Sequence, residues 1–305
     1  MAVYTPIDQD QVKAFLSTCD LGNYIRHDGI TQGVENTNYL LKTTKGPFIL
    51  TLVEKRTAPE YLPFIFSYMK HLSTAGIVVP DVLAQGVIAN KPAAIIQFLD
   101  GKAIFASQTT SHHCAQIGAT LAHMHKAAEN FTMTRDNPVG PDEWHTLFNA
   151  VKSEIDPGTA TAIKEALDEC AAIDWRSLPT GAVHADLFRD NAFFKDGNLS
   201  GIIDFYFACT APYVYDLAIT LNAWCFDRDN LPVFERVTAL TQGYQSIRPL
   251  SDAERAAFPA LRKAAAIRIL LTRLYDWFFT PPNAQVTKLD PMEYLAKLES
   301  RHAWL

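Results

Sequence analysis

The sequence predicts an α+β fold made of two lobes, a strand-rich first third and a mainly helical remainder. Short apolar runs separated by turn residues fill the region up to about residue 98, which is typical of strands. From Ser107 onward, apolar residues recur at helical spacing instead. A chain of 305 residues with 48% hydrophobic residues can bury one or two sizeable cores.

The first lobe is predicted to be a five-stranded antiparallel sheet with one helix, preceded by a short helix. Residues 7–20 form that short amphipathic helix, because Val12, Phe15 and Leu16 fall on one side of it. The following strands and helix are bounded by turn signals, the last being an Asp-Gly pair at residues 100–101. We assign residues 1–98 to this N-terminal lobe. The strands are expected at 24–32, 38–44, 47–54, 81–88 and 92–98, and the helix at 59–75.

Residues 99–305 are assigned to a mainly helical C-terminal lobe. Its long segments show the apolar spacing of helices packed on a core. A pair of short apolar arms interrupts these helical patterns near the middle of the lobe. The helices are expected at 108–129, 142–154, 157–172, 214–226, 230–244, 251–279 and 290–302.

The most informative segment is a polar run at residues 184–191, which reads His-Ala-Asp-Leu-Phe-Arg-Asp-Asn. The two apolar arms follow it, and between them lies Asp196-Gly197-Asn198, a turn signal typical of a β-hairpin. The second arm ends at Asp204. Because the arms are similar in length, the chain goes out and returns. We therefore expect Asn191 and Asp204 to lie side by side at the open end of the hairpin.

These side chains match the needs of phosphoryl transfer from a nucleotide. That reaction needs a carboxylate to orient the attacking hydroxyl and two oxygen-bearing side chains to hold magnesium against the phosphates. Asp186, Asn191 and Asp204 supply this catalytic set, in the order that protein kinases use. Magnesium prefers one or two carboxylates with phosphate oxygens and water, so Asn191 and Asp204 are the predicted metal ligands. The predicted cofactors are ATP and Mg²⁺.

The same residues carry a family resemblance. Residues 181–191, with Ile203-Asp204-Phe205 and Tyr215-Asp216-Leu217-Ala218, resemble the aminoglycoside phosphotransferase and choline kinase superfamily. Residues 32–39, 48–56 and 96–101 are similar to the bacterial homoserine kinases of that superfamily. The resemblance implies a bilobal, protein-kinase-like fold. It also implies transfer of the γ-phosphate of ATP to the hydroxyl of L-homoserine, which gives O-phospho-L-homoserine for threonine biosynthesis.

The nucleotide side of the predicted site departs from protein kinases in two ways. Their glycine-rich phosphate loop is replaced by a segment with a single glycine, in which turn-tolerant Asn and Thr could still cap phosphates. The strand lysine that grips the phosphates is replaced by Thr51. Lys55 lies on the same strand face by period-two alternation, so we favour it as the substitute cation, with Glu60 as its partner. The predicted phosphate-loop residues are Gly33, Asn36, Thr37 and Asn38.

The boundary between the lobes is the predicted adenine site. A chain that leaves a sheet edge exposes backbone N–H and C=O groups, and these can pair with an adenine edge. In the kinases that this sequence resembles, the hinge makes such contacts. Gln97 and Leu99 are therefore expected to contact adenine through their backbone.

Homoserine is a small zwitterion, so its site needs a cation for the carboxylate. Arginines that are buried in apolar helices need a partner and are candidates for this role. The predicted substrate residues are Arg189, Tyr206, Trp224, Arg268 and Arg273.

Two other functions remain open on the sequence. A choline or ethanolamine kinase would use an aromatic cage, for which Trp224, Trp277 and Tyr275 are available. A nucleotide-binding pseudokinase, acting as an interaction module, would fit the missing strand lysine.

Charge and cysteine content limit the partners and the compartment. The net charge of −6 and the absence of a basic block argue against nucleic acid or an anionic membrane as a partner. No apolar run reaches membrane-spanning length. The five cysteines are scattered and form no Cys-x-x-Cys pair, which is typical of reduced thiols in a cytoplasmic protein. The paired histidines near residues 112 and 123 are interpreted as packed helix residues rather than metal ligands.

Overall fold

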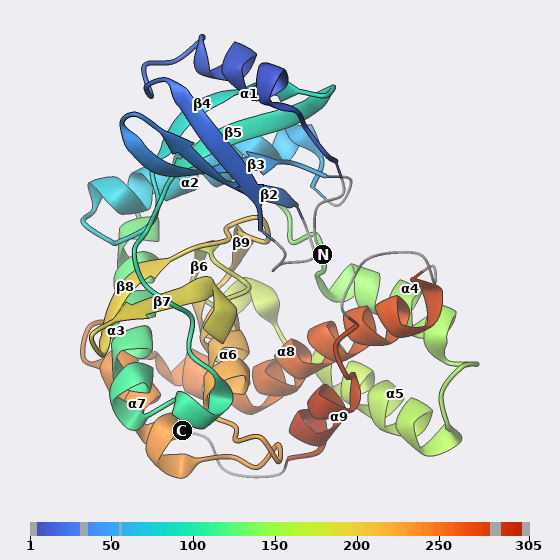
Figure 1. Ribbon diagram of the computed structural model, residues 1–305. Coiled ribbons are helices and arrows are strands. Elements are labelled where there is room, and N and C mark those ends of the chain that lie inside the picture. The colour runs from blue at the N-terminus through green and yellow to red at the C-terminus, as the bar shows by residue number, and fades with distance from the viewer. Residues whose placement is uncertain (1–4, 31–35, 55–56, 281–287, 301–305) are drawn as a thin grey trace. The chain divides into compact units, whose positions relative to one another are not determined.

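The computed structural model describes residues 5–30, 36–54, 57–280 and 288–300 (Figure 1). The chain forms two compact units, and the division between them falls after Asp100. The first unit is a sheet with helices, and the second is mainly helical. This α+β architecture confirms the predicted fold class.

The first unit contains a five-stranded antiparallel sheet with the order β1-β2-β3-β5-β4. β2 shows a regular alternation of buried and half-buried residues, as expected for a strand with one face on a core. The turn between β4 and β5 places Ala89 and Asn90 in the left-handed region. The strands are β1 (Tyr24–Gly29), β2 (Thr37–Thr43), β3 (Gly46–Leu52), β4 (Val82–Ile88) and β5 (Lys91–Gln97).

Two helices pack on this sheet. α1 (Gln9–Leu16) begins at a capping box, in which the Asp8 carboxylate accepts from the Gln11 backbone and the Gln11 side chain accepts from Asp8. Its predicted apolar side, Val12, Phe15 and Leu16, is buried in one cluster with side chains from the strands. α2 (Leu62–Thr74) follows a short 3₁₀ turn and buries most of its apolar residues.

The second unit is built around α6 (Tyr213–Trp224), whose residues are all buried. A helix that is buried on all sides belongs in the interior of its unit, so α6 is the scaffold on which the rest packs. Among the helices, α8 packs most extensively against α6, and α8 is the longest helix of the described residues. The other helices are α3 (Ser111–Ala128), α4 (Pro141–Val151), α5 (Pro157–Ala171), α7 (Phe234–Gln245), α8 (Asp252–Phe279) and α9 (Met292–Glu299).

α3 and α7 pack with their backbones unusually close. A Cβ atom at Gly118 would lie 2.0 Å from the Leu240 carbonyl oxygen, and one at Gly243 would lie 2.3 Å from that of Ala115. Both contacts are with main chain, which cannot move aside as a side chain would. Only glycine fits at these two positions, and this pair of helices carries His125 and Tyr244 to the site described below.

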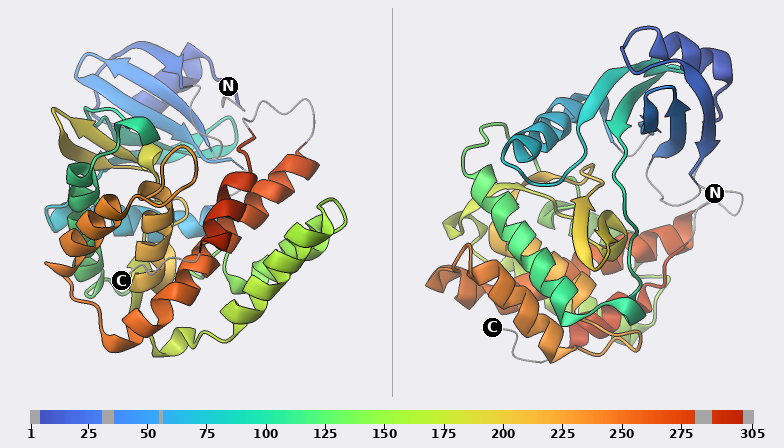
Figure 2. Two further views of the ribbon diagram at one scale, coloured as in Figure 1. Left: turned by 90° about the horizontal axis from the view of Figure 1, so that it is seen from below. Right: turned by 60° about the vertical axis from the view of Figure 1, so that its left-hand side comes forward.

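Two small sheets hold the central polar run. β7 (Ala192–Lys195) and β8 (Asn198–Ile202) form the predicted hairpin, with Asp196 and Gly197 in the left-handed conformation of its turn. β6 (Thr180–Val183) pairs with β9 (Cys209–Pro212). Both sheets lie against α3 (Figure 2). The polar run therefore leaves one sheet and enters the other.

The predicted order of elements agrees with the structure, and the differences lie mostly at element ends. The predicted helix at 230–244 begins only at Phe234, because a turn at residues 227–231 and a bridge between Phe226 and Pro232 precede it. The β6–β9 pair was not predicted. Within the described ranges, none of the helices combines the length and the apolar character needed to cross a bilayer.

Candidate active site

Residues 184–191, here termed the catalytic loop, connect β6 to β7. The His184 ring joins the loop to the chain that follows β8. Its Nδ1 accepts from the Asp186 backbone N–H at 3.2 Å, and its Nε2 donates to the Ile203 carbonyl at 3.0 Å. Burial lowers the pKa of His184, which favours the neutral ring that this pair of bonds requires. His184 thus fixes the spacing between Asp186 and Asp204.

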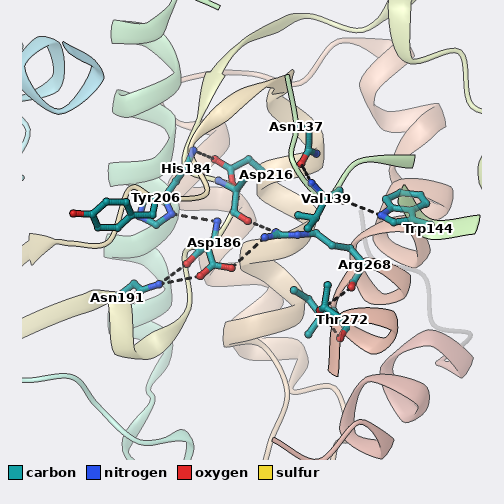
Figure 3. A network of polar contacts seen from close by, with 12 residues as sticks. Asn137, Val139, Trp144, His184, Asp186, Asn191, Tyr206, Asp216, Arg268 and Thr272 are labelled. Atoms are coloured by element: carbon teal, nitrogen blue, oxygen red, sulfur yellow. Dashed lines mark hydrogen bonds and ion pairs between the residues drawn. The ribbon is translucent and has the colours of Figure 1, made fainter. Parts of the chain in front are cut away.

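Asp216 of α6 holds the start of the catalytic loop (Figure 3). Its side chain is 0% exposed, and its Oδ2 and Oδ1 accept from the backbone N–H groups of His184 and Ala185, each at 2.9 Å. Ala185 has φ 60°, a left-handed conformation that is uncommon for a residue with a Cβ atom. Such strain persists only where the surroundings enforce it. The Asp216 carboxylate is one of the groups that enforce it.

Asp216 is the end of a chain of buried polar side chains, here termed the buried network. His125 Nε2 lies 3.1 Å from Asp216 Oδ2, and His125 Nδ1 lies 2.8 Å from the Tyr244 hydroxyl. Arg248 donates to that hydroxyl at 3.1 Å and to Glu254 at 2.8 Å. The members of the network are Asp216, His125, Tyr244, Arg248 and Glu254.

The protonation states of the network follow from burial. Burial lowers the pKa of His125, so the ring is neutral and donates its Nε2 proton to Asp216. Burial alone would raise the pKa of Asp216, but the hydrogen bonds from His125 and from the His184 backbone outweigh it and leave the pKa lowered. An ionised Asp216 is the form that can accept three hydrogen bonds.

The predicted catalytic residues meet at the open end of the hairpin. Asn191 Nδ2 donates to the Asp186 carbonyl at 2.8 Å and lies 3.3 Å from Asp186 Oδ2. The Ile203 N–H donates to the Asn191 carbonyl at 2.9 Å, so Asp204 follows directly beside Asn191. Asp204 has φ 65°, a second left-handed residue with a side chain. The structure therefore places Asp186, Asn191 and Asp204 in one site.

The donor atoms at this site suit magnesium. Because Asn191 turns its amide nitrogen toward Asp186, its amide oxygen points away from the Asp186 carboxylate. In the part of the chain that the structure describes, no three His, Cys, Asp or Glu side chains form a metal site by themselves. Two oxygen ligands that rely on phosphate and water for the rest are the arrangement that magnesium commonly adopts.

Arg268 approaches the same carboxylate from α8. Its side chain is 2% exposed, its Nη2 lies 3.4 Å from Asp186 Oδ1, and its Nη1 donates to the Ala185 carbonyl. Figure 3 shows Arg268 reaching the catalytic loop on the side of Asp186 opposite Asn191. The sequence predicted Arg268 as a substrate residue but gave no signal for its contact with Asp186.

Arg189 and Trp224, also predicted to contact the substrate, make contacts inside the protein. Arg189 donates to Thr109 Oγ1 at 3.2 Å and to the Phe226 carbonyl at 3.0 Å. Trp224 is fully buried, and its indole N–H donates to the Leu187 carbonyl at 2.9 Å. Both therefore support the catalytic loop. The carbonyl of Tyr206, a further predicted residue, accepts from Arg135 at 2.7 Å.

Arg273 belongs to a group of charges on α8 and α9, here termed the α9 cluster, in which Glu293 is the most exposed member. Arg273 is 12% exposed and lies 2.7 Å from Glu293, whose side chain is 34% exposed. Lys297 also pairs with Glu293, and burial lowers the pKa of Lys297 to about 8. Between this cluster and the catalytic loop lies Tyr294, with Arg273 4.7 Å from its ring centre and the Phe188 ring 6.4 Å away. The cluster has two cations for one carboxylate.

On the nucleotide side, the described residues of the predicted phosphate loop bond within the first unit. Asn36 Oδ1 accepts from the Glu54 N–H at 3.0 Å, and the Thr37 hydroxyl donates to the Glu54 carboxylate at 2.7 Å. Asn38 Oδ1 accepts from the Thr51 hydroxyl at 2.6 Å. Two further predicted nucleotide residues, Gly33 and Lys55, lie outside the described residues.

The predicted adenine residues lie at the end of the sheet. The Gln97 N–H donates to the Asp81 carbonyl at 2.9 Å, and Leu99 follows in the segment after β5. At the other end of β5, Lys91 pairs with the Glu54 carboxylate. Sequence reasoning missed this ion pair, since Lys91 is a strand-end charge with no motif around it.

Sequence comparison identifies the class of protein that this fold and site define. Residues 28–250 match the phosphotransferase enzyme family. A homoserine kinase of Rhizobium johnstonii is 46% identical over 307 residues, which cover 98% of this chain and 95% of that protein. The chain belongs to the phosphotransferase enzyme family. Within it, the chain is one of the homoserine kinases, phosphotransferases with an alcohol group as acceptor. This confirms the predicted family and class of reaction.

Solved structures show the same fold at low sequence identity. An amicoumacin kinase in complex with AMP-PNP, Ca²⁺ and Ami has a TM-score of 0.71 at 17% identity, covering 96% of this chain and 91% of that one. A choline kinase from Cryptosporidium parvum has a TM-score of 0.70 at 15% identity, with 95% of both chains covered.

Proposed function

We propose that this protein transfers the γ-phosphate of ATP to the hydroxyl of L-homoserine and releases O-phospho-L-homoserine and ADP, for threonine biosynthesis. The near full-length likeness to homoserine kinases supports the acceptor. The observation that carries the chemistry is the meeting of Asp186, Asn191 and Asp204 at the end of one hairpin. ATP and Mg²⁺ are the proposed cofactors, and residues 1–98 are the proposed nucleotide-binding lobe.

The roles of the three residues follow from their chemistry. Asp186 accepts a hydrogen bond from the acceptor hydroxyl, orients its oxygen toward the γ-phosphate and takes its proton. Asn191 and Asp204 would hold Mg²⁺ through their oxygen atoms, and the metal would supply positive charge beside the phosphates. Asp216 and His184 keep the catalytic loop in the strained conformation that presents Asp186.

For the carboxylate of the acceptor, we propose Arg273. Of the three predicted arginines, Arg189 and Arg268 donate to groups that hold the catalytic loop. Arg273 donates to the Asp290 carbonyl at 2.9 Å and to Glu293, a carboxylate that is 34% exposed and shared with Lys297, and the Tyr294 ring lies between Arg273 and Phe188 of the catalytic loop. Glu293 in the same cluster could accept from the ammonium group of the acceptor. Such a pair of opposite charges suits an α-amino acid.

An acceptor panel tests the proposed reaction. ADP release with ATP and Mg²⁺ is compared on L-homoserine, choline, ethanolamine and 3-aminopropanol, which is homoserine without its carboxylate. L-Homoserine should be the best acceptor, because its carboxylate pairs with a cation that is otherwise left unmatched, worth roughly 1–3 kcal/mol. Equal efficiency on choline or 3-aminopropanol would make the acceptor assignment wrong and leave the kinase assignment intact.

Two variants test the roles of the catalytic residues. Asp186→Asn should lower turnover on the order of 10²–10⁴-fold with little change in ATP affinity, because it removes the base but no nucleotide contact. Asp204→Ala should abolish turnover and weaken calorimetric binding of ATP only when Mg²⁺ is present. If Asp204→Ala keeps the metal dependence of the wild type, Asp204 is not a ligand.

A further inference from the structure

Two groups hold the Asp186 carboxylate from opposite sides. Asn191 Nδ2 lies 3.3 Å from Oδ2, and Arg268 Nη2 lies 3.4 Å from Oδ1. A carboxylate on a short side chain has little freedom left when both of its oxygens are fixed. Asn191 is already accounted for as a proposed metal ligand. Arg268 has so far no role in the reaction.

Arg268 also holds the backbone next to the base. Its Nη1 donates to the carbonyl of Ala185, the residue with φ 60°, whose N–H is held by Asp216. Ala185 is therefore held through both of its backbone groups. The Asp216 carboxylate accepts from its N–H, and the Arg268 guanidinium group donates to its C=O. The guanidinium group also lies 5.0 Å from the ring centre of Phe207, which follows shortly after Asp204. One side chain thus touches the base, the strained residue and the segment of the metal ligand.

We propose that Arg268 is a positioning residue for Asp186, and that it does not bind the carboxylate of the acceptor. The proposal rests on the proposed function, in which Asp186 orients the acceptor hydroxyl. Because Arg268 is only 2% exposed, it would have to leave Ala185 and Asp186 to reach a ligand, and the partly buried Asp186 carboxylate would then lose its cationic partner. Its planar guanidinium group spans a carbonyl and a carboxylate at once, which the single ammonium group of a lysine cannot do.

The decisive measurement compares two acceptors in two variants. Arg268→Met removes the charge and keeps most of the volume, whereas Arg268→Lys keeps the charge but only one point of contact. Misplacing the base should lower kcat about 10²-fold in Arg268→Met and about tenfold in Arg268→Lys. The loss should be the same factor on L-homoserine and on 3-aminopropanol, with KM for ATP nearly unchanged, because the group removed acts on the base and on neither substrate.

Arg262→Met is the matched control. Arg262 lies on the same helix, is also 2% exposed and donates to the carbonyls of Lys297 and Ser300. This variant removes an equally buried arginine from α8 without touching the catalytic loop. It should lower the melting temperature and leave kcat of the folded protein close to the wild-type value.

The outcomes separate the alternatives. A loss confined to L-homoserine would show that Arg268 binds the acceptor carboxylate, and an unchanged kcat would show that it has no part in the reaction; either result overturns the proposal. If Arg268→Met does not melt cooperatively, Arg268→Lys decides by the same criteria. If the wild type uses another acceptor, the proposed function fails, and the variants are compared on that acceptor with and without a carboxylate.

Discussion

The second unit contains two groups of charged side chains that differ in burial and in balance. In the buried network, Asp216 and Glu254 are almost completely buried, and their oxygens accept from backbone N–H groups or from other members. In the α9 cluster, Glu293 is 34% exposed and shared by two cations. The polar groups of the first group are hydrogen-bonded inside the protein, whereas the second has two cations around one partly exposed carboxylate.

This difference distinguishes charges that hold the structure together from charges that can bind a ligand. A buried charge is tolerated only where its partners are complete, so the network can hold the catalytic loop but can offer nothing to a ligand. A partly exposed cluster with two cations around one carboxylate gains when an anion arrives. Substitutions in the network should therefore change stability and turnover together. Substitutions in the α9 cluster should change recognition of the acceptor.

The largest effect is expected for Asp216→Asn. An asparagine cannot accept from His184, Ala185 and His125 together, so at least one buried donor loses its partner, which costs about 1–3 kcal/mol for each such donor. Released strain at Ala185 should also lower kcat about 10²-fold. Urea unfolding and turnover measure the two effects.

Asp168→Asn is the control for Asp216→Asn, because it breaks an exposed ion pair with Lys164 on α5. It should leave the unfolding free energy close to the wild-type value, because exposed ion pairs contribute little. Similar losses in the two variants would remove the distinction between buried and exposed charge.

An intermediate effect is expected for Arg273→Met. Loss of the cation that pairs with the acceptor carboxylate should raise KM for L-homoserine about 10- to 100-fold, the equivalent of roughly 1–3 kcal/mol. KM for 3-aminopropanol should not change. Arg255→Met, at an exposed position of the same helix, is the control and should behave as the wild type. Equal changes for both acceptors would exclude a carboxylate contact.

The smallest effect is expected for His125→Gln, and it depends on pH. At pH 7 the free energy of unfolding of the variant should be about 1 kcal/mol lower, which is the contribution of one hydrogen bond. Burial lowers the pKa of His125 in the folded protein, so the unfolded chain binds its proton first. The wild type therefore loses stability as pH falls below the ordinary histidine pKa, about 6.5.

The variant should lose stability less steeply in that range, since only His184 then remains as a buried neutral ring on this loop. His123→Gln, at an exposed position of α3, should reproduce the wild-type curve. Melting temperature against pH compares the three proteins. If the melting temperature of His125→Gln falls with pH as steeply as that of the wild type, the His125 ring is not held neutral.

Sequence patterns predicted the features of this protein that depend on residues close together in the chain. The turn Asp196-Gly197-Asn198 and the two equal arms were enough to bring Asn191 beside Asp204. The β6–β9 pair was missed because its strands have four residues each, and their pairing depends on a partner beyond the hairpin. The contact of Arg268 with Asp186 was missed for the same reason. It joins α8 to a loop that is distant in sequence, and no periodicity records such a contact.

The complete burial of α6 has a consequence for hydrogen exchange. Amide protons exchange with solvent only when their segment opens, and the slowest ones report the region that opens last. α6 has no exposed face and carries Asp216, which holds the catalytic loop. Its amides should exchange only on global unfolding. The loop that presents Asp186 is thus bonded to the helix that should be the last part of its unit to unfold. Other parts of the unit can therefore open to admit substrates and release products while the base stays in place.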